Sequence, residues 1–109
     1  MDSDTTTLLS SRLVIITECI VKYPEIFNHR EFTNDLDTFK EKVLAADGCF
    51  DVQILIERTT PCTKFFFIST WTSYEAWVPH MESSYTKRMT KFSKKYLSEY
   101  NAYVTEEYF

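Results

Sequence analysis

Residues 65–84 read FFFISTWTSYEAWVPHMESS, and this stretch decides the fold. It begins with an apolar run typical of a buried strand and continues into a segment with apolar residues at helical spacing. It also holds both tryptophans, Trp71 and Trp77, and one of the two histidines, His80. We therefore predict a strand that ends at Trp71 and leads directly into a helix carrying Trp77 and His80.

The residues after Trp71 predict a short helix. Thr72 or Ser73 can act as its N-cap, and Pro79 has no N–H to donate within the helix, which must be kinked or short. Its apolar stripe is expected to consist of Tyr74, Trp77, Val78 and Met81. His80 then lies at the edge of this stripe, with an ordinary pKa of about 6.5.

An earlier helix is predicted from about residue 28 to Gly48. Asn28 would be its N-cap, with Glu31 completing a capping box, and Phe27 is placed to pack on the helix. Gly48 is a natural left-handed stop. The buried face at helical spacing is Phe32, Leu36, Phe39 and Val43.

Three further strands follow from alternation and β-branched residues. They are expected at 13–22, at 50–57, which a turn joins to the strand at 65–71, and at 102–109. Residues 1–11 are polar and read as a flexible tail before a single domain spanning 12–109. A third helix from about Ser84 would bury Tyr85, Met89, Phe92, Tyr96 and Tyr100.

This order predicts an α+β fold with a ferredoxin-like split βαβ arrangement and an antiparallel four-stranded sheet. Helices can cover only one face of such a sheet. The strands at 13–22 and 65–71 are nevertheless apolar on both faces, so the second face needs another cover. The sheet of an identical subunit would supply it.

The pattern of strand, Trp71, Ser73, Glu75-Ala-aromatic, His80 and a serine shortly after resembles the antibiotic biosynthesis monooxygenase family of dimeric α+β barrels. The resemblance extends over residues 13–109. It implies a homodimer, and an enzyme that oxidises a quinol, an anthrone or a similar aromatic small molecule with O₂. It also implies that no cofactor and no metal are used.

The resemblance assigns catalytic roles to His80, as base or donor, and to Trp71, as pocket wall and donor. The candidate substrate-binding residues are Trp77, Tyr74, Tyr85 and Glu18. Each has a structural alternative: His80 as a hydrogen-bonding core residue, the tryptophans as core packing, and Glu18 as the partner of a lysine or arginine. His29, the other histidine, is expected in an exposed helical turn.

Two other functions remain open on the same scaffold: a small-molecule-binding or purely structural barrel dimer, and an isomerase. A haem-degrading branch of the fold is not supported. That branch has an Asn on its first strand, a Trp where this sequence has His80, and a His ligand near the position of Met89.

The net charge and the cysteine content limit which partners and which location can be expected. The net charge of −4 argues against nucleic-acid binding, and no apolar run approaches the ~20 residues needed to span a membrane. A basic stripe on the third helix, Lys87, Arg88, Lys91, Lys94 and Lys95, is expected to be a solvated face. Cys19, Cys49 and Cys62 are odd in number and without metal-binding spacing, which favours a reducing, cytoplasmic location.

Overall fold

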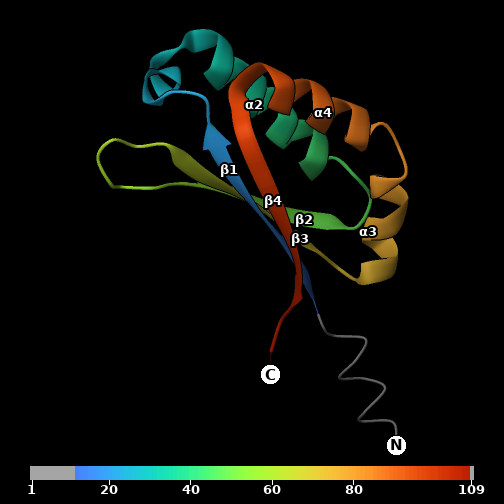
Figure 1. The fold of residues 1–109 in the computed structure, drawn as a ribbon. Helices are drawn as coiled ribbons and strands as arrows, with labels where there is room; N and C mark the ends of the chain where they lie inside the picture. The colour runs from blue at the N-terminus through green and yellow to red at the C-terminus, as the bar shows by residue number, and fades with distance from the viewer. Residues whose placement is uncertain (1–11, 109) are drawn as a thin grey trace, which may run out of the picture.

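The structure, a computed structural model, describes residues 12–108 as one antiparallel sheet with helices on a single face (Figure 1). The strands are β1 (Leu13–Val21), β2 (Cys49–Ile56), β3 (Lys64–Trp71) and β4 (Leu97–Glu106), in the order β2-β3-β1-β4. The helical segments are η1 (Pro24–Asn28), α2 (Arg30–Leu44), α3 (Tyr74–Met81) and α4 (Tyr85–Tyr96). The predicted ferredoxin-like α+β fold is confirmed. The expected tail, 1–11, lies outside the described residues.

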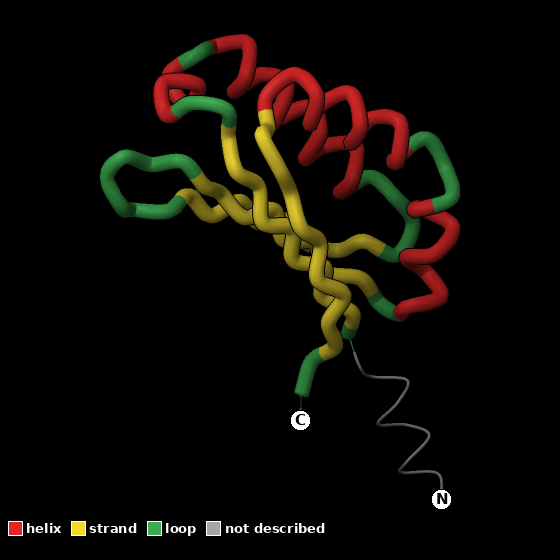
Figure 2. The backbone as a smooth tube through the Cα atoms, viewed as in Figure 1, coloured by secondary structure: helices red, strands yellow, loops and turns green. Residues whose placement is uncertain are grey.

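The two faces of the sheet differ in what covers them. In β1 the odd-numbered residues from Leu13 to Val21 are buried under the helices, while the even-numbered residues between them are only partly covered. Strand β3 alternates in the same way, and Figure 2 shows the helices gathered on one side of the sheet. The helix-free face carries Val14, Ile16, Ile20, Phe66 and Ile68, together with Glu18 and Lys64. This face is largely apolar, as predicted, and no element among residues 12–108 covers it.

Aromatic rings fill the space between the helices and the sheet. Phe39 of α2 stacks on Phe92 of α4 with ring centroids 5.7 Å apart, and it lies 5.1 Å from the ring of Phe67 on β3. Phe32 meets Phe65 edge to face at 5.9 Å. The face of α2 predicted at helical spacing is therefore the buried one.

The start of α2 differs from the prediction. Asn28 is the last residue of the 3-10 helix η1, so it cannot be the N-cap. His29 occupies that position with extended backbone and makes no side-chain capping bond, and Glu31 pairs with Lys95 instead of completing a capping box. Pro24 pre-sets the backbone for the short helix that displaces the cap. The expected contact of Phe27 with the helix does form, because its ring lies 5.6 Å from the ring of Phe32.

The boundary between α4 and β4 also differs from the prediction. The helix ends at Tyr96, and the strand begins at once with Leu97 paired to Val21. Tyr100 continues the spacing of the helix in sequence but lies in β4, opposite Cys19 and 41% exposed. Backbone pairing with β1 outweighs the helical pattern here, so the final strand starts five residues earlier than expected.

Gly48, the only glycine of the chain, occupies a position where a side chain would not fit. Its φ of +87° is in the left-handed region, and a Cβ at this position would lie 2.5 Å from the Cβ of Ala76 on α3. The carbonyl of Gly48 also accepts a hydrogen bond of 2.8 Å from the N–H of Thr72. Gly48 thus lets the turn before β2 pack directly against the start of α3, the helix that carries His80.

Candidate functional site

The candidate site is an inner cavity of about 90 Å³ between α3, α4 and the strands β1 and β4. Its lining consists of Ile15, Thr17, Trp77, Met81, Tyr85, Thr86, Met89, Tyr100 and Ala102. A second void of about 10 Å³, room for a single water, adjoins it and shares Thr17, Tyr85 and Met89. Two methionines in the lining give the cavity walls that can change shape around a ligand.

The polar groups of the inner cavity are hydroxyls. Thr17 is buried on the helix-facing side of β1, and Tyr100 stands at the exposed rim on β4. Burial raises the pKa of Tyr85 to about 12, with smaller contributions from Cys19 and Tyr100. The phenol of Tyr85 therefore stays protonated at neutral pH and can donate a hydrogen bond to an oxyanion.

His80 is buried on α3, with 9% of its surface exposed. Ser73 caps this helix by accepting a hydrogen bond of 3.1 Å from the N–H of Ala76. The imidazole lies between two rings, with centroid distances of 4.8 Å to Trp71 and 4.5 Å to Tyr85. Within residues 12–108 its Nε2 atom has no hydrogen-bond partner.

Burial, and then the charge of Arg88, hold the pKa of His80 below its usual 6.5. The expectation of an ordinary pKa at the edge of an apolar stripe is wrong. The expected stripe residue Tyr74 is 51% exposed, while His80 points inward. In so short a helix, packing of one turn against β3 and α4 decides which side is buried. A neutral imidazole at pH 7 follows, which is the form that accepts a proton.

Trp71 is a core residue in this structure. It is 1% exposed at the end of β3, and its indole N–H donates to the hydroxyl of Ser69 at 2.9 Å. Neither Trp71 nor His80 lines the inner cavity. His80 instead borders an open surface hollow of about 420 Å³, beside Gly48, Pro79 and Ser83. Of the residues singled out from sequence, Trp77 and Tyr85 line the inner cavity.

Glu18 and Tyr74 lie away from the inner cavity. Glu18 is on the helix-free face and forms an ion pair of 2.9 Å with Lys64, the structural alternative weighed for it. That contact, the leading cause, lowers the pKa of Glu18. Tyr74 packs on Trp77 at the surface, with ring centroids 5.7 Å apart. The structure thus brings Trp77 and Tyr85 together with residues that the sequence did not single out as site residues, among them Thr17, Met89 and Tyr100.

Two further findings concern residues 12–108 only. No group of three or more His, Cys, Asp and Glu side chains is arranged to hold a metal ion among them. None of the helices within this range has the length and apolar character needed to cross a bilayer.

The fold and the site together define a class of protein: a ferredoxin-like α+β domain with an apolar cavity under its helices that carries hydroxyl groups. Residues 28–91 match the family described as antibiotic biosynthesis monooxygenase, and this match covers more than half of the chain. The protein belongs to that family, as the resemblance around Trp71 and His80 implied. A comparison with curated proteins found no match.

Solved structures share the fold at low sequence identity. A protein from Pseudomonas aeruginosa is 16% identical, with 93% of this chain and 98% of that chain covered and a TM-score of 0.70. A conserved protein from Methanosarcina mazei is 22% identical, covering 90% and 96%, with a TM-score of 0.68. A variant of SnoaB, a cofactor-independent oxygenase from Streptomyces nogalater, is 14% identical, covering 88% and 91%, with a TM-score of 0.67.

Proposed function

We propose that the protein is a cofactor-independent monooxygenase that oxidises a quinol, an anthrone or a similar electron-rich aromatic molecule with O₂. The observation that carries the proposal is the inner cavity, whose apolar walls surround the protonated phenol of Tyr85. Family membership and the likeness to a cofactor-independent oxygenase support the same reaction class. The chain's own side chains then have to bind the aromatic ring and hold its anion.

The reaction needs a base and a donor. An anthrone methylene gives one proton to the base, and the resulting carbanion transfers electrons to O₂. A C–O bond forms to give a hydroperoxide, and loss of the second methylene proton then breaks its O–O bond, so that one oxygen stays in the product as a carbonyl and the other leaves as water. Tyr85 would donate to the anion's oxygen, and apolar walls such as Trp77 would hold the ring and exclude water.

We assign the base to His80, acting beside Tyr85. Its low pKa keeps it neutral, and the free Nε2 atom has no competing hydrogen bond within the described residues. Tyr85 lines the inner cavity and contacts the ring of His80, which does not line it, so we propose that the ring of Tyr85 turns to let the substrate reach the imidazole. In this scheme Trp71 acts on the reaction by holding His80 in place rather than by touching substrate.

The test is O₂ consumption by the purified wild-type protein with a panel of quinols and anthrones. A saturable, protein-dependent rate with one carbonyl oxygen of the product derived from ¹⁸O₂ supports the proposal. If every member of the panel is consumed no faster than in buffer, the monooxygenase assignment fails. An isomerase would convert its substrate without any O₂ uptake.

We also propose a homodimer in which two sheets pack face to face. The helix-free face presents apolar residues from β1 and β3, while Tyr103 of β4 and Leu55 of β2 are 51% and 50% exposed on the same side. Such a surface favours burial against a matching one. Glu18 and Lys64 neutralise each other within it, which lowers the cost of covering them.

One observation favours a binding protein without turnover as the second candidate. The inner cavity is small compared with the roughly 300–1,000 Å³ of usual ligand pockets, and no charged side chain lines it. A binding protein would retain an aromatic ligand while leaving O₂ untouched.

Three free cysteines, of which Cys19 is buried with its pKa raised to about 12, support a reducing, cytoplasmic location for either function.

A further inference from the structure

We propose that a cleft on the outer surface, between α2 and α4, binds a small organic anion: a phosphate or carboxylate group attached to an aromatic body. The cleft measures about 270 Å³. Its lining consists of Asp35, Thr38, Phe39, Lys42, Arg88, Lys91, Phe92, Lys95 and Tyr96. This cationic cleft is separate from the inner cavity, and the proposal does not depend on the monooxygenase function.

The positive charge of the cationic cleft is largely unpaired. Among residues 12–108, Lys42, Arg88 and Lys91 form no ion pair with any carboxylate. They come from two helices, Lys42 from α2 and the other two from α4, so the fold concentrates them at one place. In a chain with a net charge of −4, such a local excess of positive charge selects an anion.

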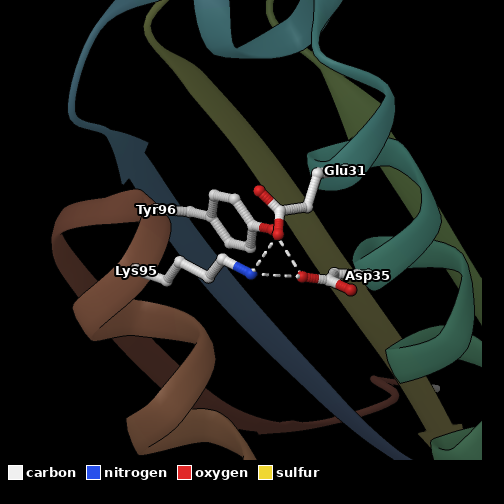
Figure 3. Close-up of polar contacts among 4 residues, drawn as sticks. All are labelled: Glu31, Asp35, Lys95 and Tyr96. Carbon is white, nitrogen blue, oxygen red and sulfur yellow. Dashed lines mark hydrogen bonds and ion pairs between the residues drawn. The ribbon is translucent and has the colours of Figure 1, made fainter.

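The carboxylates nearest the cleft are already occupied (Figure 3). Lys95 forms ion pairs with Glu31 at 2.7 Å and with Asp35 at 3.3 Å. The hydroxyl of Tyr96 donates to the same Asp35 carboxylate, and these contacts lower the pKa of Asp35, with the Tyr96 bond as the largest cause. The charge of Lys91 also lowers the pKa of Asp35, so this single carboxylate already faces Lys95 and Lys91, and the positive charges of Lys42 and Arg88 remain in excess.

Arg88 adds a donor that lacks an acceptor. One guanidinium nitrogen, Nη1, donates to the hydroxyl of Ser84. The Nε atom is buried and has no partner within the described part of the chain. A buried N–H without an acceptor is destabilising, and a guanidinium has the planar geometry that carboxylate and phosphate oxygens fit. Because Arg88 lines the cleft, an anion bound there can pair with its guanidinium group.

Aromatic side chains of the core give the cleft an apolar floor against which an aromatic body can pack. Phe92 and Tyr96 border the cleft from α4, and Phe39 borders it from α2. Lysine stems add further apolar surface, because their methylene groups lie along the walls while the ammonium groups reach the solvent. Phe39 and Phe92 also line the small void next to the inner cavity. This stacked pair of rings therefore borders both that void and the cationic cleft.

The experiment is a titration of the whole protein with phenyl phosphate, benzoate and inorganic phosphate, followed by calorimetry and by amide chemical shifts. We expect saturable binding of phenyl phosphate or benzoate, with shifts centred on α2 and α4. The tighter of the two identifies the head group. No saturable binding of either probe overturns the proposal. Equal affinity for inorganic phosphate and phenyl phosphate overturns the requirement for an aromatic body.

Matched variants locate the site. Lys42→Gln and Lys91→Gln should each weaken binding on the order of tenfold, the effect of losing one charged hydrogen bond. Lys87→Gln makes the same charge change on α4 outside the cleft and should leave affinity within about twofold. Arg88→Lys keeps the charge but loses the planar donor pair, and it should also weaken binding. If Lys87→Gln weakens binding as much as Lys91→Gln, the attraction is diffuse and the site is wrong.

Discussion

The ring of His80 packs against the ring of Tyr85 at a centroid distance of 4.5 Å, and of these two residues only Tyr85 lines the inner cavity. The two side chains sit on consecutive helices, α3 and α4. The imidazole of His80, whose Nε2 atom has no hydrogen-bond partner among residues 12–108, thus contacts a phenol that lines the cavity. This arrangement makes the roles of the two residues separable by substitution.

Tyr85→Phe should lower turnover on the order of 10²-fold, because one donor to the developing oxyanion is lost while the ring is kept. Tyr74→Phe is the matched control, since Tyr74 is 51% exposed and lies outside the cavity. The measurement is initial-rate O₂ uptake with the best substrate of the panel. Unchanged turnover in Tyr85→Phe would remove Tyr85 from the mechanism.

His80→Ala should reduce turnover on the order of 10²-fold or more if His80 is the base. In the wild-type protein, kcat/KM should rise with pH as the imidazole loses its proton, and the midpoint of the rise should lie below pH 6.5 because the pKa is lowered. A pH–rate profile checks both points. A rise centred well above pH 7 would point to the substrate's own ionisation instead.

The stability of the protein should also depend on His80. The unfolded chain protonates this imidazole near pH 6.5, whereas burial holds the folded pKa lower. Between these two values the unfolded state binds more protons, so stability falls as pH drops through this window and is unaffected above it. Urea unfolding between pH 5 and 8 should show this fall. The His80→Gln variant should lose it, while His29→Gln, at an exposed position, should retain it.

Ile16→Asp should convert the proposed dimer into a monomer, because it places a charge in the middle of the helix-free face. Light scattering should give twice the 12.9 kDa chain mass for the wild type and the single mass for the variant. Leu44→Asp, an equal change at a 43% exposed site on α2, should remain dimeric. A wild-type protein of single mass at micromolar concentration would contradict the sheet-to-sheet dimer.

Gly48→Ala should destabilise the protein by about 1–3 kcal/mol, through the positive φ and the overlap with Ala76. Asp47→Ala, an exposed neighbour in the same turn, should change the free energy of unfolding by less than about 0.5 kcal/mol. Urea denaturation of both variants provides the comparison. Equal stability of Gly48→Ala and the wild type would mean that the turn can move away from α3.

The strands and the buried face of α2 could be predicted because alternation and helical spacing record burial directly. Local patterns failed where a distant contact decides the outcome. Tyr100 continues the spacing of α4, but pairing with β1 draws it into β4. The buried side of α3 depends on how the rings of Trp71 and Tyr85 pack around His80 in three dimensions, which helical spacing alone does not record.

The candidate site shows the same division. Trp77 and Tyr85 could be found because they lie near the motif, whereas Thr17 and Tyr100 reach the inner cavity through strand register. The basic stripe on α4 was expected to be only a solvated face. Its spacing could not reveal that α2 places Lys42 across from Arg88 and Lys91.

The central position of β1 has a consequence for synthesis. Leu13 pairs on one side with Trp71 and on the other with Glu106, so neither neighbour of this strand exists when it leaves the ribosome. Pairings this distant in sequence are slow to close. During translation the most apolar strand of the sheet is therefore the one that waits longest for its partners. A nascent chain of this protein must keep β1 from associating with other unfinished chains until its last strand has been made.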